Sequence, residues 1–203
     1  MKRCMIELVG TFYLTMAISL TGNPIAIGLM LMAIICVGGR LSGGHFNPAI
    51  SLAAFLQKRL DMSQLIKYWI SQTIGAFLAL CLFMMFTNNV FAPEIIPGSS
   101  VFATVAMEGL LTKLFCWVFL TMLMLERTST TSFVGIVMGL TLMSIVFVGG
   151  LFNPAVAAGS LVCSLLKDGS LGDFYTVLVY IVGPLLGGVM ASYAFNFFNR
   201  EQQ

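Results

Sequence analysis

The stretch "GGHFNPAI" at residues 43–50 returns as "GGLFNPAV" at residues 149–156. Asn is a favoured helix N-cap residue, because its side-chain oxygen accepts hydrogen bonds from the free N–H groups of the first turn. Proline suits the first helical position, where no N–H is needed and φ is already helical. Each copy therefore predicts the beginning of a helix, one at Asn47 and one at Asn153.

The sequence around both copies is strongly apolar. Hydrophobic residues make up 59% of the 203 residues and charged residues only 9%, and the mean hydropathy is +0.98. A soluble globular domain carries about a quarter charged residues, so this chain has too few charges to cover a water-exposed surface. The composition predicts an integral membrane protein that lies in a lipid bilayer.

Long and short apolar stretches alternate along the chain. A helix needs about 20 apolar residues to cross the hydrocarbon core, and two shorter pieces, 47–57 and 153–166, begin at the repeated motifs. We expect these two pieces to be re-entrant half-helices. The predicted fold class is an all-α membrane protein with six transmembrane helices and two half-helices. The expected spans are 4–21, 25–41, 66–86, 101–125, 132–150 and 174–198.

The repeat extends beyond the octet. "IELVGT" at 6–11 and "MEGLLT" at 107–112 both place Glu and Thr four residues apart, and "GLMLMAIICVGG" at 28–39 resembles "GLTLMSIVFVGG" at 139–150. The chain thus divides into two halves, each with three spans and one half-helix, within one membrane domain. An odd number of spans inverts the second half, as in inverted-topology repeats around a midplane site. The expected repeats are 1–100 and 101–203.

The basic residues suggest an orientation. If both termini are cytoplasmic, most Lys and Arg residues fall on the inner side, in agreement with the positive-inside rule. Lys167 then lies outside, and Lys113 lies within the fourth span, where a salt bridge, snorkelling or a subunit contact all remain open. The residues expected inside are Lys2, Arg3, Arg40, Lys58, Arg59, Lys67, Arg127 and Arg200.

The sequence gives little sign of nucleic-acid binding, metal binding or catalysis. The formal net charge is only +2, which disfavours a nucleic-acid partner. The five cysteines lack metal-ligand spacing, and a single histidine with no nucleophile–base set gives no basis for an enzyme. We predict no catalytic residue, no metal and no cofactor.

The repeated motif and its flanks resemble the aquaporin family of major intrinsic proteins, over nearly the whole chain. "SGGHFNPAIS" at 42–51 is similar to the family's first Asn-Pro-Ala loop, and "YWISQTIGAFLA" at 68–79 and "VGPLLGGVMAS" at 182–192 are similar to its third and sixth spans. The resemblance implies one pore per subunit, a homotetramer, and half-helices that meet at mid-membrane. It implies a pore constriction formed by Asn47, Pro48, Ala49, Asn153, Pro154 and Ala155.

The half-helices suggest how such a constriction excludes ions. Each helix N-terminus carries about half a positive charge, so two N-termini meeting at the midplane oppose cations and hydronium, as in the aquaporin-type pores from which this logic is taken. If the oxygens of Asn47 and Asn153 cap the helices, their amide N–H groups remain free to hold the oxygen of a passing water. By resemblance, Glu7 and Glu108 brace the re-entrant loops by accepting hydrogen bonds, and His45 supports the first loop.

The family's selectivity filter maps onto a different set of residues. The positions are Ile27, Gly150, Val156 and, on the fifth span, either Thr141 or Val146. Most members carry Arg where this chain has Val156, so the filter resembles that of plant tonoplast intrinsic proteins, which pass water and small neutral nitrogen compounds. Ammonia, urea and hydrogen peroxide are therefore candidate solutes beside water.

Several alternatives stay open. A glycerol or polyol facilitator is less favoured, because the Asp that follows the second motif in many facilitators is absent. A secondary transporter and a poorly conducting adhesion protein could use the same fold. Arg40 stands where the family usually has His, and either adds cation repulsion or contacts lipid phosphate.

Overall fold

The structure, a computed structural model, describes residues 1–95, 97–124, 130–171 and 173–199. Within these ranges the chain forms six helices that are long and apolar enough to cross a membrane and two shorter ones, which confirms the predicted fold class. The short helices are α3 (Pro48–Leu56) and α7 (Pro154–Asp168). The long helices are α1 (Lys2–Thr21), α2 (Pro24–Ser42), α4 (Met62–Thr87), α5 (Val101–Met124), α6 (Thr131–Val148) and α8 (Phe174–Asn199).

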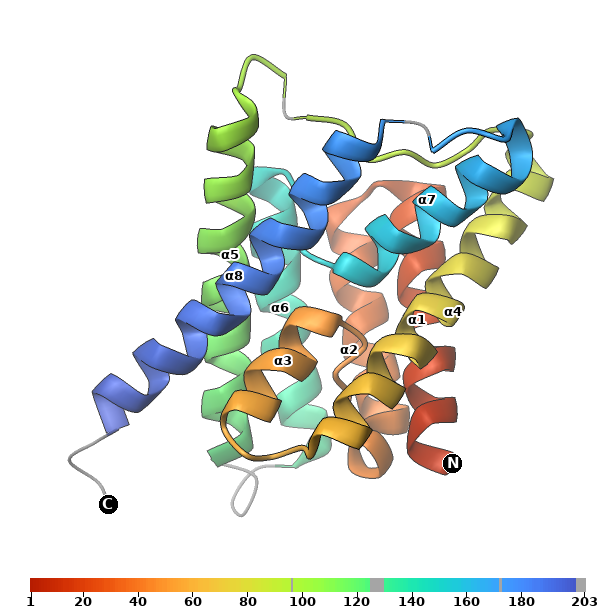
Figure 1. The fold of residues 1–203 in the computed structure, drawn as a ribbon. Coiled ribbons are helices and arrows are strands. Elements are labelled where there is room, and N and C mark those ends of the chain that lie inside the picture. Colours follow the sequence, from red (N-terminus) through yellow and green to blue (C-terminus); the bar gives the residue numbers. More distant parts are fainter. Residues whose placement is uncertain (96, 125–129, 172, 200–203) are drawn as a thin grey trace.

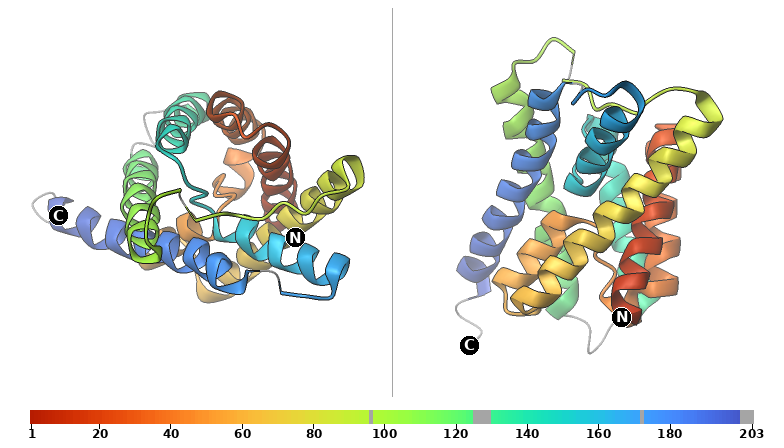
Figure 2. Two further views of the ribbon diagram at one scale, coloured as in Figure 1. Left: turned by 90° about the horizontal axis from the view of Figure 1, so that it is seen from above. Right: turned by 45° about the vertical axis from the view of Figure 1, so that its right-hand side comes forward.

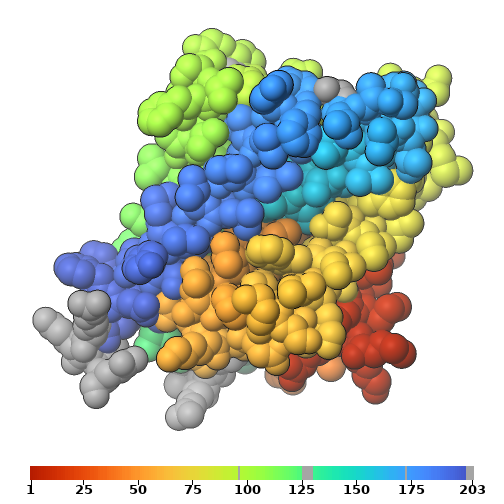
Figure 3. Space-filling view, in the orientation of Figure 1, coloured from red at the N-terminus to blue at the C-terminus, as the bar shows by residue number. Residues whose placement is uncertain are grey.

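The two short helices enter the bundle from opposite ends. Figure 1 shows α3 and α7 with their N-terminal ends facing each other at mid-height, and α1 beginning and α8 ending at the same end of the molecule. Seen from above, the loops before α3 and α7 meet inside the ring of long helices (Figure 2). On the face drawn in Figure 3, α3 and α7 lie between α4 and α8. We call the end near Lys2 and Asn199 the termini end.

Glycines let the long helices pack closely. A Cβ atom on Gly28 of α2 would lie 2.6 Å from the carbonyl oxygen of Gly139 on α6, and one on Gly139 would lie 2.5 Å from the carbonyl oxygen of Gly28. The two backbones are thus in direct contact. Such close approach at small residues is typical of helix pairs in membranes, where dispersion contacts rather than water exclusion drive packing.

The half-helices begin where the sequence predicts. The side-chain oxygen of Asn47 accepts a hydrogen bond from the N–H of Ala49 at 2.8 Å, and that of Asn153 accepts one from Ala155 at 3.1 Å. Some predicted boundaries are wrong. The span expected from residue 66 begins at Met62, because Asp61 caps α4 by accepting a hydrogen bond from the N–H of Gln64 at 2.7 Å. The span expected to reach residue 150 ends at Val148, because the following residues, Gly149 (φ 105°) and Gly150 (φ 131°), have left-handed backbone conformations that end the helix.

Candidate functional site

The two half-helices are linked to each other by their N-cap residues. The side-chain amide nitrogen of Asn47 donates a hydrogen bond to the carbonyl oxygen of Phe152 at 2.7 Å, and that of Asn153 donates one to the carbonyl oxygen of Phe46 at 3.0 Å. Each Asn therefore caps its own helix and bonds to the loop of the other. The sequence-based expectation that both amide groups are wholly free needs correcting. One N–H of each amide is used in this cross-link, and the second remains.

The two phenylalanines that accept these bonds have an unusual backbone conformation. Phe46 (φ 49°) and Phe152 (φ 57°) lie in the left-handed region, which bulky residues rarely adopt. Both side chains are fully buried. Such strain of about 1–3 kcal/mol persists only where surrounding contacts enforce it. The loop geometry at both Asn residues is therefore held by the structure around it.

Two buried glutamates supply part of that hold. The carboxylate of Glu7 accepts hydrogen bonds from the backbone N–H groups of His45 (3.0 Å) and Phe46 (2.6 Å). Ser42 and Gln72 donate to it as well, at 2.6 and 2.8 Å. The Ser42 hydroxyl distance is in the usual range for an O–H donor to a carboxylate, and the Phe46 N–H distance is short for an N–H donor. The first loop is thus tied to α1 and α4 through one carboxylate.

Glu108 holds the second loop with fewer donors. Its two oxygens accept the N–H groups of Leu151 (2.7 Å) and Phe152 (2.8 Å). On alignment of "YWISQTIGAFLA" with the stretch that begins at Tyr180, the position equivalent to Gln72 is Pro184, whose side chain has no donor to replace the Gln72 amide. The two loops are therefore held by the same chemistry, with four donors on Glu7 and two on Glu108.

The space between the two N-caps is very narrow. A cavity of about 10 Å³ lies beside Asn47 and Asn153, close to the smallest volume that holds one water molecule. His45 also borders it, with Nδ1 3.1 Å from Ser51 Oγ and its ring edge-on to Tyr68 and Phe119. The remaining walls are apolar and come from Leu14, Ile18, Leu31, Phe115, Leu142 and Leu151.

These apolar wall residues were missed by the sequence analysis, although the repeat contained a signal for them. When Glu7 is aligned with Glu108, Leu14 falls on Phe115. When residues 28–39 are aligned with 139–150, Leu31 falls on Leu142. Equivalent positions in an inverted repeat face a shared site at the midplane. Searching for such apolar pairs would have found four of the six residues.

The expected filter residues lie apart from this cavity, whose described walls include none of them. Ile27 is buried in the large apolar core, against which Val146 also packs. Thr141 is half-buried, and its hydroxyl donates to the carbonyl oxygen of Val137 at 2.8 Å. At Gly150, a Cβ atom would lie 2.4 Å from Glu108 Oε1, so contact with the bracing carboxylate requires glycine there.

Val156 belongs to a second apolar cluster near the end opposite the termini. It is fully buried and shares this cluster with Leu151 and Tyr180. Phe91 and Ile95, from the connection between α4 and α5, pack against the same cluster, and the Tyr180 hydroxyl donates to the carbonyl oxygen of Glu94. This connection runs across the end of the bundle in the view from above (Figure 2).

The structure also shows the surroundings of two basic residues whose roles the sequence did not decide. Arg40 donates from Nε to the hydroxyl of Thr131 at 3.0 Å, which joins the ends of α2 and α6. Lys113 is half-buried in a groove along α8 with Tyr193 and Asn196. Neither residue lines the cavity between the two Asn residues.

Comparisons with known proteins agree with this geometry. The family model described as "Major intrinsic protein" matches residues 1–195. Glycerol uptake facilitator protein-like 6 of Lactiplantibacillus plantarum is 30% identical and covers 95% of this chain and 96% of its own length. Probable aquaporin TIP2-2 of Oryza sativa subsp. japonica is 29% identical and covers 84% of this chain and 68% of its own length.

A solved structure shares the fold. The X-ray structure of the aquaglyceroporin from Plasmodium falciparum superposes with a TM-score of 0.86 at 22% sequence identity, covering 96% of this chain and 95% of that one. Members of the matched family are passive membrane channels rather than enzymes. The extent of the family match, together with six spans and two half-helices, shows that the chain belongs to the major intrinsic protein family.

Proposed function

We propose that this channel conducts water and small neutral solutes in single file and excludes ions and protons at the Asn47–Asn153 constriction. The observation that carries the proposal is the pair of cross-links between the half-helices, beside a cavity of about 10 Å³, close to the smallest volume that holds one water molecule. Each Asn has one amide N–H left over, and both residues border the cavity. These two N–H groups are the donors for a passing water oxygen.

Ion exclusion follows from the same arrangement. The half-helix N-termini each contribute about half a positive charge at one depth. The carboxylates nearest the loops, Glu7 and Glu108, are fully buried and accept hydrogen bonds from loop N–H groups. They are thus turned away from the permeant path and brace the loops. A cation at the constriction meets positive dipoles with no compensating charge, whereas a neutral molecule meets donors that replace its water contacts.

We assign the cytoplasmic side to the termini end. Six of the eight basic residues expected inside lie near helix ends on that side: Lys2, Arg3, Arg40, Lys58, Arg59 and Lys67. Arg127 and Arg200 lie outside the described residues. Lys167 lies at the opposite end of the bundle, which fits the positive-inside rule. We also propose a homotetramer with one pore in each subunit, by analogy with the family. The two repeats, 1–100 and 101–203, then form one pore together.

For the selectivity filter we favour Ile27, Val146, Gly150 and Val156 over a set that contains Thr141. Val146 packs against the same apolar core as Ile27, and it lies near the end of α6 opposite the termini. The Thr141 hydroxyl is already bonded to its own helix. A filter built from these residues offers apolar walls and no guanidinium. It is expected to pass ammonia, urea or hydrogen peroxide beside water.

The direct test is a stopped-flow measurement on purified protein in vesicles. Water, urea, ammonia and glycerol permeabilities are compared with those of empty vesicles, and proton flux is followed under a pH gradient. We expect raised water permeability with no added proton leak. Water permeability equal to that of empty vesicles, with folded protein present, would contradict the proposal and favour an adhesive or structural role.

A glycerol facilitator is the second candidate. The relative from Lactiplantibacillus plantarum carries that description in its name, and the cavity walls are rich in Leu, which suits the carbon side of a polyol. A filter without the arginine is wider than one that contains it and also admits larger neutral solutes. The vesicle measurement therefore distinguishes the two candidates. Glycerol permeability that exceeds urea and ammonia permeability would favour the facilitator.

A further inference from the structure

A large polar pocket lies away from the constriction, at the termini end. Its volume is about 670 Å³, and its walls come from the end of α3 and the last turns of α5 and α8. It shares no described residue with the cavity at Asn47 and Asn153. The lining residues are Leu56, Gln57, Lys58, Arg59, Leu120, Leu123, Met124, Phe195, Asn196 and Asn199.

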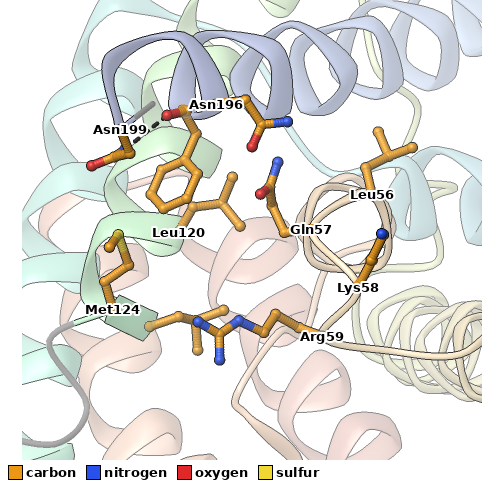
Figure 4. Close-up of a pocket in the computed structure, with 10 residues that line it drawn as sticks. Leu56, Gln57, Lys58, Arg59, Leu120, Met124, Asn196 and Asn199 are labelled. Carbon is orange, nitrogen blue, oxygen red and sulfur yellow. Dashed lines mark hydrogen bonds between the residues drawn. The ribbon is translucent and has the colours of Figure 1, made fainter. Parts of the chain in front are cut away.

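The polar groups of this pocket point in different directions, and only Gln57 and Asn196 are directed toward each other (Figure 4). In Figure 4, Arg59 extends from the end of α3 toward Met124 of α5, and Gln57 points toward Asn196 of α8. Lys58 lies at the edge beside Leu56. The described lining contains two cations and no acidic residue. The described part of the lining thus carries two positive charges, with carboxamide N–H donors on the α8 side and apolar walls on α5.

A strained turn places the two cations. Lys58 has a left-handed backbone conformation (φ 57°), at the position after a helix where glycine is usual. The turn is closed by hydrogen bonds from Lys58 N to the carbonyl oxygen of Phe55 (2.8 Å) and from Arg59 N to that of Ala54 (2.9 Å). The chain thereby reverses and directs Arg59 back under α3. A lysine at this position costs stability that a glycine would not.

A second contact fixes the pocket wall. The side-chain nitrogen of Gln57 donates to the carbonyl oxygen of Ser192 at 3.1 Å and to its hydroxyl at 2.6 Å. These bonds tie the end of α3 to α8. Asn199 donates to the carbonyl oxygen of Phe195 at 2.7 Å, while Asn196 is exposed beside it. The wall between α3 and α8 is thus fixed by hydrogen bonds, while Lys58 and Arg59 are exposed at the pocket.

We propose that this pocket binds the phosphate group of an anionic phospholipid from the leaflet at the termini end. Arg59 and Lys58 supply the charge, and the carboxamide of Asn196 supplies a further donor. Leu123, Met124 and Phe195 form an apolar wall for the start of the acyl chains. Basic pockets between transmembrane helices on the cytoplasmic side are suited to lipid headgroups. The site does not depend on which solute the channel conducts.

The test titrates detergent-solubilised protein with phosphatidylglycerol and reads the rise in thermal stability, which gives an apparent Kd. Phosphatidylcholine serves as the zwitterionic comparison, and glycerol 3-phosphate and inorganic phosphate are the soluble arms. We expect tighter binding of phosphatidylglycerol than of any other probe. Arg59→Gln and Lys58→Gly should each weaken it about fivefold. Lys58→Gly also relieves the backbone strain, so its loss of binding is not a folding defect.

Two further variants separate a pocket from general surface charge. Lys67→Gln removes a cation from α4 at the same end of the molecule but outside the pocket lining, and it should leave the apparent Kd unchanged. Met124→Trp adds bulk to the α5 wall of the pocket without changing its charge and should weaken the binding of phosphatidylglycerol. An effect of Lys67→Gln equal to that of Arg59→Gln would overturn the proposal. So would equal affinity for glycerol 3-phosphate, which would assign the pocket to soluble phosphates.

Discussion

The side-chain amide of Asn47 donates to the carbonyl oxygen of Phe152 at 2.7 Å, although 105 residues separate them in sequence. The equivalent bond runs from Asn153 to Phe46 at 3.0 Å. Each phenylalanine is held on its other side by the glutamate of its own half, through its N–H group. The two halves therefore fix each other's pore loop, and neither loop is expected to keep its geometry without the other.

The first prediction replaces both amides by carboxylates, as Asn47→Asp with Asn153→Asp. Aspartate still caps each half-helix, but its second oxygen faces a carbonyl acceptor and brings negative charge between two positive helix ends. We expect increased proton or cation leak in vesicles under a pH gradient, together with lower thermal stability in detergent.

Asn23→Asp is the matched control for this pair. Asn23 caps α2 by accepting from Ile25 at 2.9 Å, and it is exposed far from the cavity. It should change neither leak nor stability appreciably. Unchanged proton flux in the folded double variant would mean that the two Asn residues do not form a shared gate.

The second prediction concerns the bracing carboxylates. Glu7→Leu orphans four donors and Glu108→Leu orphans two. Each buried donor left unpaired costs about 1–3 kcal/mol, so the thermal stability should fall further for Glu7→Leu. Gln keeps one acceptor oxygen at each site and should be tolerated better than Leu. Equal stability of the Gln and Leu variants would argue against bracing.

The predictability of this site from sequence was uneven. The octets at 43–50 and 149–156 were sufficient to place both half-helices, because an Asn-Pro pair has a strong local preference to begin a helix. The partners of Asn47 and Asn153 were not predictable in the same way. They are backbone carbonyls of the opposite loop, and a backbone group leaves no mark in the sequence.

Burial was a second limit of the sequence reading. Glu7 and Glu108 were recognisable as charges within apolar spans, where a carboxylate needs partners. Which donors satisfy them depends on how α1, α2 and α4 pack. The role of Gly150 also depends on packing. Alignment assigned it to the filter, but in the structure its missing side chain makes room for Glu108.

The third prediction tests the packing of the first loop. A Cβ atom on Gly10 would lie 2.1 Å from the ring of Phe46. Gly10→Ala should therefore destabilise the protein, at the cost of about 1–3 kcal/mol typical of an overpacked core. Combining it with Phe46→Leu removes the clashing ring atoms. The double variant should lose less stability than the sum of the two single variants, and strict additivity in detergent melting would show that the ring and Gly10 are not coupled.

The last prediction concerns Val156, which lies three residues after Asn153 in the first turn of α7. Its side chain is fully buried in the cluster with Leu151 and Tyr180. On the proposed filter assignment, a valine there offers no hydrogen-bond donor, so a solute that passes loses water contacts without replacement. In Val156→Arg, the guanidinium cannot stay unpaired in this apolar cluster, and the route open to it is toward the pore and its water.

We expect Val156→Arg to keep measurable water permeability while reducing urea or ammonia permeability several-fold, on the order of the 1–3 kcal/mol that one steric or polar contact discriminates. Paired water and solute fluxes from one vesicle batch provide the measurement. Val156→Leu is the control, since it adds bulk without a donor or charge and should discriminate less between water and the larger solutes than Val156→Arg does. If Arg lowers both fluxes by the same factor, its guanidinium does not reach the permeant path, because a donor in the filter must discriminate between water and a larger solute.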